Sequence, residues 1–196
     1  MVGITGPPGA GKSTFAALLL DDFNREQEGF AADVPMDGFH LSNAQLERLG
    51  RRGRKGAVDT FDVAGYVDTL KRVAREHGRS DVYVPVFDRT LDESVAARGV
   101  VPAQSRLVVT EGNCLALSDE GWQPVAALLH RLYYIDCPAT MRRRRLVERH
   151  VAGGRDHNEA LNWVATVDEP NVRLISSTRH ACHRTLHITD LDGAIE

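Results

Sequence analysis

Short apolar runs alternate along this chain with longer stretches whose apolar residues recur every three or four positions. The short runs predict strands at residues 1–5, 30–36, 82–87, 107–110, 132–136 and 186–188. The longer stretches predict helices, such as one capped by Asp62 and carrying the apolar series Val63, Tyr66, Val67, Leu70 and Val73. Strands that alternate with helices form a parallel sheet covered on both faces. We therefore expect an α/β fold with a five-stranded parallel core, in which 82–87 and 107–110 are buried strands.

Length and composition favour a single compact domain over residues 1–196. The chain is 42% hydrophobic and 26% charged, which is too apolar for a disordered protein and too often interrupted by charge for a membrane span. A formal net charge of −3 gives no overall basic field, so we expect neither nucleic acid nor a membrane as a partner. Three cysteines in separate contexts, with no apolar leader before the first motif, favour reduced thiols in a cytoplasmic protein.

The most specific motif follows the first predicted strand. It fulfils the pattern G-x-x-x-x-G-K-[ST] between an apolar strand and an amphipathic helix. In this motif backbone N–H groups surround phosphates, the lysine reaches the outer phosphates and the hydroxyl ligates magnesium, so ATP and Mg²⁺ are the expected ligands. A glycine-rich turn that only caps the helix is the alternative. The candidate nucleotide-binding residues are Gly6, Gly9, Ala10, Gly11, Lys12, Ser13 and Thr14.

A later strand supplies a second candidate ligand for the metal. The apolar run 107–110 ends at Glu111, and open α/β sheets bind ligands at the carboxyl ends of their strands. Beside Ser13, Glu111 would hold Mg²⁺ directly or through water. The alternative is a strand that simply ends in a solvated acid.

Further motifs follow the phosphate loop: Met36–His40, Lys55–Asp62, Val84–Asp88, Thr110–Asn113 and an arginine-rich stretch ending Gly154-Arg155-Asp156. In this order they resemble the uridine kinase, pantothenate kinase and phosphoribulokinase family, and most of all its bacterial uridine-kinase-like and fructose-transport-system-kinase-like members. The likeness covers nearly the whole chain. It implies a P-loop NTPase fold with an arginine-rich helical lid and transfer of the γ-phosphoryl group of ATP to an alcohol on a small metabolite. Relatives form dimers or tetramers, which leaves room for a homodimer.

The resemblance also assigns roles in acceptor binding. Asp37 matches the carboxylate that accepts the proton of the substrate hydroxyl, and a carboxylate across from a phosphate loop can orient an alcohol for attack. A simple turn at Asp37 is the alternative. Phe39 and His40 belong to the same motif and are expected in the acceptor pocket. Asp59 matches an acid that binds substrate hydroxyls in uridine kinases, unless it is only a loop acid beside Asp62.

Two other segments are expected to contact the acceptor. Phe87 and Arg89 match positions that line the pocket in the family. The permanent cation of Arg89 favours a carboxylate, a phosphate or several hydroxyls, unless it pairs with a neighbouring aspartate. Asp168 and Asn171 lie three residues apart and share a helix face. A carboxylate at Asp168 would repel the carboxylate of pantothenate, which favours a sugar or polyol as the acceptor.

Residues 142–157 resemble the lid of the family, in which arginines close over the phosphates of ATP. The four consecutive arginines at 142–145 point around more than half of a helix, so some of them face solvent. A solvated basic helix face and a nucleic-acid patch are the alternatives, and the basic stretch 51–55 is expected to be a solvated loop. The expected lid residues are Arg145 and Arg149 for the transferring phosphoryl group and Arg155 for ATP.

The sequence therefore predicts an ATP-dependent kinase that phosphorylates a hydroxyl of a sugar, nucleoside or related metabolite, with a pantothenate-type kinase as one alternative. A nucleotide-dependent regulatory ATPase or switch is the alternative from another class. A guanine-specific switch would carry an N-K-x-D stretch, which the sequence lacks. The histidines and cysteine at 180–187 have a spacing that fits no zinc pattern.

Overall fold

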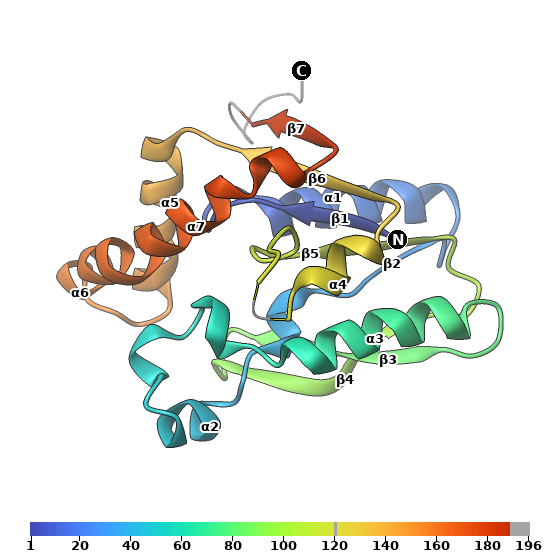
Figure 1. The fold of residues 1–196 in the computed structure, drawn as a ribbon, viewed down its shortest axis with the longest axis horizontal. Helices are drawn as coiled ribbons and strands as arrows, with labels where there is room; N and C mark the ends of the chain where they lie inside the picture. The colour runs from blue at the N-terminus through green and yellow to red at the C-terminus, as the bar shows by residue number, and fades with distance from the viewer. Residues whose placement is uncertain (120, 189–196) are drawn as a thin grey trace.

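The computed structural model describes residues 1–119 and 121–188, and its centre is a five-stranded sheet in the order β2-β5-β1-β6-β7 (Figure 1). All the pairings in this sheet are parallel. Its strands are β1 (Val2–Thr5), β2 (Ala31–Asp33), β5 (Leu107–Glu111), β6 (Arg131–Asp136) and β7 (Arg184–His187). Because Ile4 lies opposite Glu111 in the register, the loop that follows β1 begins beside the end of β5.

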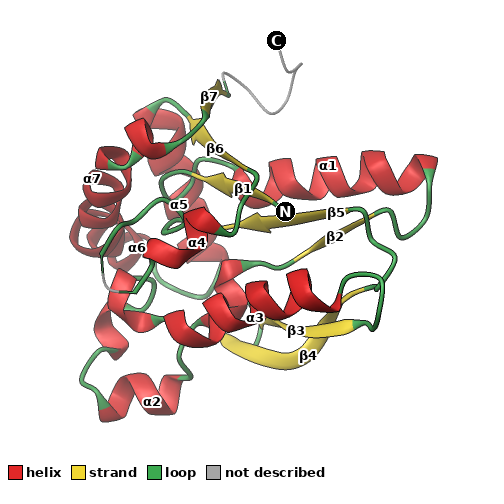
Figure 2. Cartoon of the chain, turned by 45° about the vertical axis from the view of Figure 1, so that its right-hand side comes forward, coloured by secondary structure: helices red, strands yellow, loops and turns green. Residues whose placement is uncertain are grey.

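Helices cover both faces of this sheet, as predicted. Successive side chains of a strand point to opposite faces, so Val108 and Val109 of β5 belong to different cores. One core lies between the sheet and the helices α3 (Val63–Glu76), α4 (Gln123–Ala127) and α7 (Glu169–Ser177). The other lies under α1 (Lys12–Glu26) and the start of α5 (Ala139–Ala152). Figure 2 shows α1 and α4 on opposite sides of the parallel strands.

The predicted helix after Asp62 is confirmed with its cap. The Asp62 carboxylate accepts a hydrogen bond from the Gly65 backbone N–H at 2.9 Å, which satisfies one of the free donors at the start of α3. The apolar series along the helix is buried in the first core. This helix lies along a separate two-stranded hairpin below the main sheet (Figure 1).

The prediction that residues 82–87 form a buried strand of the parallel sheet is wrong. They belong to β3 (Val82–Asp88), which pairs in antiparallel fashion with β4 (Glu93–Val101), a strand that we did not predict. Val82 and Val84 of β3 are buried and Tyr83 between them is exposed, because one face of the hairpin packs on the domain and the other faces solvent. The turn between the two strands consists of residues 89–92.

The predicted strand 30–36 is also shorter than expected. It ends at Asp33, and a 3₁₀ turn, η1 (Met36–Phe39), follows Pro35. Proline lacks the N–H that a strand ladder needs, which explains the early end. The remaining helices are α2 (Asn43–Arg48) and α6 (His157–Trp163), with 3₁₀ turns at η2 (Arg52–Arg54), η3 (Val58–Thr60) and η5 (Arg179–Ala181) and a π-helical turn at η4 (Val164–Asp168).

Within the part of the chain that the structure describes, none of the helices combines the length and the apolar character that crossing a membrane requires.

Candidate active site

The phosphate loop, residues 6–11, joins β1 to α1. Gly6, Gly9 and Gly11 have φ angles of 150°, 78° and 96°, in the left-handed region that favours glycine. A Cβ atom on Gly9 would lie 2.7 Å from the Arg142 carbonyl oxygen, so α5 packs directly on the loop. Gly11 is the N-cap of α1, and because glycine has no side chain, the first N–H groups of the helix receive no side-chain cap. The loop therefore presents glycine backbone at a helix N-terminus, an arrangement that fits phosphate groups.

The Lys12 side chain is folded over this loop and is 7% exposed. Its Nζ donates a hydrogen bond to the Pro7 carbonyl oxygen at 3.0 Å. Burial lowers the pKa of Lys12 to about 8, although the carboxylates of Glu111 and Asp37 act in the opposite direction. The Arg149 guanidinium lowers it further. Lys12 is thus within electrostatic reach of both predicted acids and of one lid arginine.

Ser13 and Glu111 lie together, as their predicted metal role requires. The Ser13 hydroxyl donates to Glu111 Oε1 at 3.2 Å. Burial raises the pKa of Glu111 to about 7, and the Asp37 carboxylate raises it further, while Lys12, the Ser13 hydrogen bond and Arg89 lower it. A hydroxyl and a carboxylate are the hard oxygen donors that Mg²⁺ prefers, so this pair fits the metal.

Two residues to which the sequence assigned no role in the site hold the end of β5 in place. The Thr110 hydroxyl donates to the Val34 carbonyl oxygen at 2.5 Å and lies 2.5 Å from the Tyr66 hydroxyl. Both side chains are fully buried. This network ties β5 to α3 and to the segment after β2, immediately before Glu111. A buried threonine next to the strand-end acid was the available signal.

Asp37 lies on the 3₁₀ turn η1 rather than at a strand end. A Cβ atom on the next residue, Gly38, would overlap the Pro85 carbonyl group, so the turn packs tightly against β3. The Asp37 carboxylate raises the pKa values of both Lys12 and Glu111, which places it across from the phosphate loop. The geometry therefore brings the predicted base to the predicted phosphate site.

The other residues of that turn face different surroundings. The Phe39 ring is buried and packs edge-on against Tyr66 at 5.0 Å, and its predicted substrate contact stays a prediction. His40 hydrogen-bonds the Asp37 carbonyl oxygen through Nδ1 at 2.8 Å and packs against the rings of Phe61 and Phe87 at 4.1 and 4.9 Å. Burial lowers the pKa of His40, which favours the neutral ring.

The arginines of α5 point to different places. Arg142 is buried and pairs with Glu169 at 3.1 Å, while Arg145 contacts the Cys137 sulfur at 3.7 Å. Part of the Arg149 side chain is exposed, yet partial burial lowers its pKa, and the charge of Arg89 lowers it further. Asp168 and Asp37 act in the opposite direction. Of the predicted lid residues, Arg149 is therefore the one that the structure brings to the phosphate loop.

Arg155 is held away from that position by its own contacts. Its guanidinium stacks over the Trp163 ring at 4.0 Å and hydrogen-bonds His150 Nδ1 at 3.1 Å. The other ring nitrogen of His150 lies 2.8 Å from the carboxylate of Asp168, which ends the π-helical turn η4. Sequence reasoning missed His150, and it left Asp168 without a partner. The contacts of Arg155 with ATP and of Asp168 with the acceptor stay predictions.

The basic stretch 51–55 is not a simple solvated loop, because its cations are paired. Arg54 holds both carboxylate oxygens of Asp59 at 2.5 Å, and Arg51 approaches the same carboxylate at 3.3 Å. The predicted binding of substrate hydroxyls by Asp59 has no support from these contacts and stays a prediction. Asn171 donates to the Gly56 carbonyl oxygen at 3.2 Å and so secures the same loop.

The turn after β3 carries the remaining predicted residues. The Phe87 ring lies between His40 and the Lys55 ammonium, which is 4.9 Å from its centre. Arg89 is exposed, and among residues 1–119 and 121–188 it forms no hydrogen bond or ion pair. The alternative that Arg89 pairs with Asp88 or Asp92 is wrong, because Arg98 pairs with the first and Arg52 with the second.

Comparisons with known proteins match the fold of this chain. The model of the phosphoribulokinase/uridine kinase family matches residues 1–186. The chain is 35% identical to YggC of Escherichia coli over 183 residues, 92% of this chain and 75% of that protein. It is 32% identical over 162 residues to the candidate uridine kinase C227.14 of Schizosaccharomyces pombe, which covers 79% and 67% of the two chains.

A solved structure gives the same result for the fold. The crystal structure of a candidate fructose transport system kinase from Silicibacter sp. TM1040 superposes with a TM-score of 0.82 at 33% identity. The match covers 94% of this chain and 87% of that one. The predicted P-loop kinase architecture is therefore confirmed.

Proposed function

Because the chain belongs to the phosphoribulokinase/uridine kinase family, we propose that it transfers the γ-phosphoryl group of ATP to a hydroxyl of a small metabolite. The acceptor is a sugar, a nucleoside or a related compound. One observation carries the proposal: the Ser13 hydroxyl bonds Glu111 beside the phosphate loop, and the Asp37 carboxylate raises the pKa values of both Lys12 and Glu111. A carboxylate that faces both a phosphate-binding lysine and a metal-binding acid is placed to act on an alcohol at the terminal phosphate.

The phosphate side of the site is formed by the loop and its flanking residues. The backbone N–H groups from Gly9 to Thr14 bind the phosphates of ATP, and Lys12 leaves the Pro7 carbonyl for the outer phosphates. Ser13 and Glu111 would hold Mg²⁺, which neutralises phosphate charge when it is bound. Arg149, which is exposed beside the loop, binds oxygens of the transferring group.

Asp37 acts on the acceptor. Its carboxylate accepts a hydrogen bond from the acceptor hydroxyl and orients the oxygen for in-line attack. The acceptor oxygen forms a bond to the γ-phosphorus while the bond from that phosphorus to the bridging oxygen of ADP breaks. The hydroxyl proton passes to the Asp37 carboxylate, and ADP leaves with the bridging oxygen. His40, bonded to the backbone of Asp37, fixes the turn that carries this carboxylate.

The names of two relatives support an alcohol as the acceptor. The Schizosaccharomyces pombe relative is named for uridine and the Silicibacter structure for fructose, and each of these compounds offers hydroxyl groups. We further propose that the protein works in the cytoplasm on a small molecule, without nucleic acid or membrane as a partner. A homodimer is compatible with this function.

Replacing Asp37 tests the proposal. ADP release is measured with MgATP and each of a set of sugars, nucleosides, sugar acids, sugar phosphates and polyols, for the wild type, Asp37→Asn and the surface control Asp22→Asn. We expect one acceptor to raise the rate, and Asp37→Asn to lower kcat by about 10²- to 10⁴-fold. The nucleotide affinity of Asp37→Asn and the kcat of Asp22→Asn stay within about threefold of the wild-type values. If no acceptor raises ADP release, or if Asp37→Asn is as active as the wild type, the proposal is wrong.

A further inference from the structure

We propose that the acceptor carries an anionic group, a carboxylate or a phosphate, and that Arg89 binds it and thereby selects the substrate. This proposal rests on the kinase function above, because it concerns the second substrate of the same site. It narrows the acceptor class from any sugar, nucleoside or related alcohol to one that bears a negative charge. Four features of the structure support it.

The first is that Asp88, the acid next to Arg89, already has other partners. The Asp88 carboxylate accepts hydrogen bonds from the backbone N–H groups of Thr90 and Leu91 at 2.8 and 3.0 Å, and it also pairs with Arg98. A carboxylate with three donors has little left to offer a further guanidinium. Asp88 therefore fixes the turn around Arg89 and leaves the side chain of Arg89 free.

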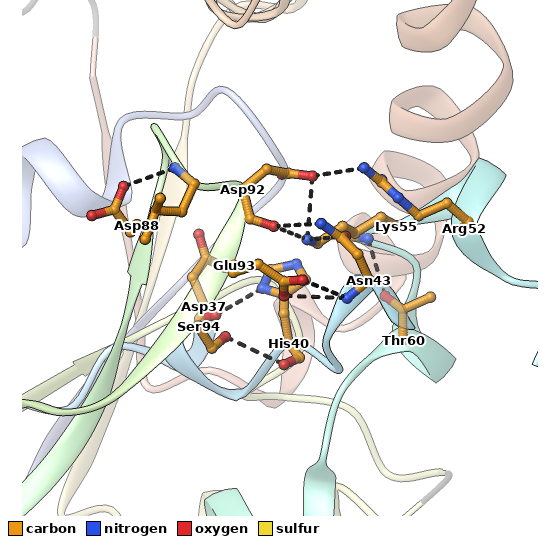
Figure 3. Close-up of polar contacts among 12 residues, drawn as sticks. Asp37, His40, Asn43, Arg52, Lys55, Thr60, Asp88, Asp92, Glu93 and Ser94 are labelled. Carbon is orange, nitrogen blue, oxygen red and sulfur yellow. Dashed lines mark hydrogen bonds and ion pairs between the residues drawn. The ribbon is translucent and has the colours of Figure 1, made fainter. Parts of the chain in front are cut away.

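The second is that the other end of the turn is clamped as well (Figure 3). The Asp92 carboxylate pairs with Arg52 at 3.0 Å and with Lys55 at 3.4 Å, while Lys55 also bonds the Asp92 carbonyl oxygen. Lys55 is only 7% exposed and additionally bonds the Asn43 side chain at 2.8 Å. Asp92 has a φ of 52°, which is unusual for a residue with a side chain and which this clamp maintains. The backbone on both sides of Arg89 is thus held.

The third is the position of Arg89 relative to Asp37 and the phosphate loop. Its hairpin packs on the turn that bears Asp37, since Gly38 lies directly against Pro85 of β3. The charge of Arg89 lowers the pKa values of Glu111 and Arg149, so its guanidinium lies within electrostatic reach of the phosphate side of the site. The phosphates of ATP approach the site from the loop, where Lys12 already provides a cation. Arg89 belongs to its acceptor side.

The fourth is that Asp59 and Asp168, the other acids expected near the acceptor, are paired within the protein. From the sequence, Asp168 was expected to repel a substrate carboxylate. In the structure its carboxylate is 2.8 Å from His150, and that of Asp59 is bound by Arg51 and Arg54. Both negative charges therefore have partners within the protein. Within the described residues, Arg89 is the cation on the acceptor side without a hydrogen bond or ion pair, and Asp37, which acts on the reacting hydroxyl, is the carboxylate there without one.

A free guanidinium on a rigid turn is suited to a carboxylate or a phosphate. Its planar donors match two oxygens of either group, and preorganisation reduces the entropy lost on binding. A neutral hydroxyl would replace water at Arg89 without matching its charge. The anionic member of a pair of otherwise similar acceptors is therefore the better substrate.

Matched pairs of acceptors test this proposal. The pairs differ only in the charged group: glycerate and glycerol, pantothenate and pantothenol, ribulose 5-phosphate and ribulose. For each pair kcat and KM are measured with the wild type, Arg89→Met, Arg89→Lys and the surface control Arg25→Met, which lies in the last turn of α1. The carboxylate pairs and the phosphate pair separate the two sources of negative charge.

We expect the wild type to prefer the anionic member of at least one pair. Arg89→Met should lower kcat/KM for that anion by about 10- to 100-fold, chiefly through KM, and should change the neutral member by less than about threefold. Arg89→Lys should retain part of the preference, and Arg25→Met should retain all of it. The melting temperature of Arg89→Met should equal that of the wild type, because Arg89 has no partner in the described structure.

Three results would overturn the proposal in distinguishable ways. If acceptors stimulate ADP release but the neutral members are used as well as the anionic ones, the kinase function stands and the anion site does not. If Arg89→Met lowers kcat equally for both members of a pair, Arg89 serves the transferring phosphoryl group instead. If no member of any pair stimulates ADP release, and no neutral sugar or nucleoside does either, the kinase proposal fails and the anion site with it.

Discussion

The ionisation of Glu111 should set the pH dependence of Mg²⁺-dependent nucleotide binding. Glu111 must be a carboxylate to hold the metal with Ser13, and burial raises its pKa to about 7. Below that pH the Glu111 carboxyl group of the free protein is mostly protonated, and its proton has to leave before the metal binds. Lys12 must be an ammonium to bind phosphate, and burial lowers its pKa to about 8, so its contribution is lost above that pH. Affinity should therefore fall on both sides of an optimum between the two values.

The magnitude follows from the two ionisation fractions. At pH 7.5 roughly three quarters of each group is in the required form, whereas at pH 6 only about a tenth of Glu111 is ionised. The product of the two fractions is largest near pH 7.5. It is about sixfold lower at pH 6 and also about sixfold lower at pH 9. A sixfold change in affinity corresponds to about 1 kcal/mol, which is well within reach of calorimetry.

Isothermal titration calorimetry with ADP and Mg²⁺ at pH 6, 7.5 and 9 measures this profile. Glu111→Gln removes the acidic limb of the protein and leaves only the titration of the nucleotide itself, so it is the matched control. Lys12→Met removes the alkaline limb in the same way. If the wild type and Glu111→Gln lose affinity equally between pH 7.5 and 6, Glu111 is not the group that limits metal binding.

Three further substitutions test the packing that builds the site. Gly9→Ala should lower the unfolding free energy by at least about 2 kcal/mol, because a Cβ at positive φ would meet the Arg142 carbonyl group. The control Gly50→Ala also has a positive φ but no neighbour within 4 Å, so it should cost about half as much. Equal melting temperatures for the two variants would contradict this. Tyr66→Phe should cost about 1 kcal/mol and weaken Mg²⁺ binding by freeing Thr110, and unchanged Mg²⁺ affinity would refute the positioning role. Asp62→Ala should lower stability by about 1 kcal/mol in urea unfolding through loss of the cap of α3, and no change would contradict it.

The features that the sequence predicted well are those set by local pattern. The phosphate loop follows from a motif of eight residues, and the cap at Asp62 follows from the residue type before an apolar series. The pairing of Ser13 with Glu111 follows from a general rule about parallel sheets, because strand ends that carry ligands meet at one edge. Each of these features is determined by the residues of one short segment or by the strand topology that all parallel α/β sheets share.

The features that the sequence did not predict depend on how strands and charged side chains pair in the folded chain. Whether residues 82–87 join the main sheet or a hairpin depends on β4, whose apolar pattern is weak. Asp59 and Asp168 are available acids in the sequence, but they are paired in the structure with partners 5 and 18 residues away. Partners for a charged side chain cannot be counted before the fold is known. This is why Arg89, undecided in the sequence, stands out only once its neighbours are placed.

The fate of the γ-phosphoryl group tests the kinase function most directly. ATP labelled in that group is incubated with the protein, Mg²⁺ and each acceptor, and the products are identified by mass spectrometry. The account predicts that the label appears in a phosphate ester of one acceptor, in amounts equal to the ADP released, and that Asp37→Asn abolishes this product. Label found only in inorganic phosphate, at a rate that no acceptor changes, would contradict it.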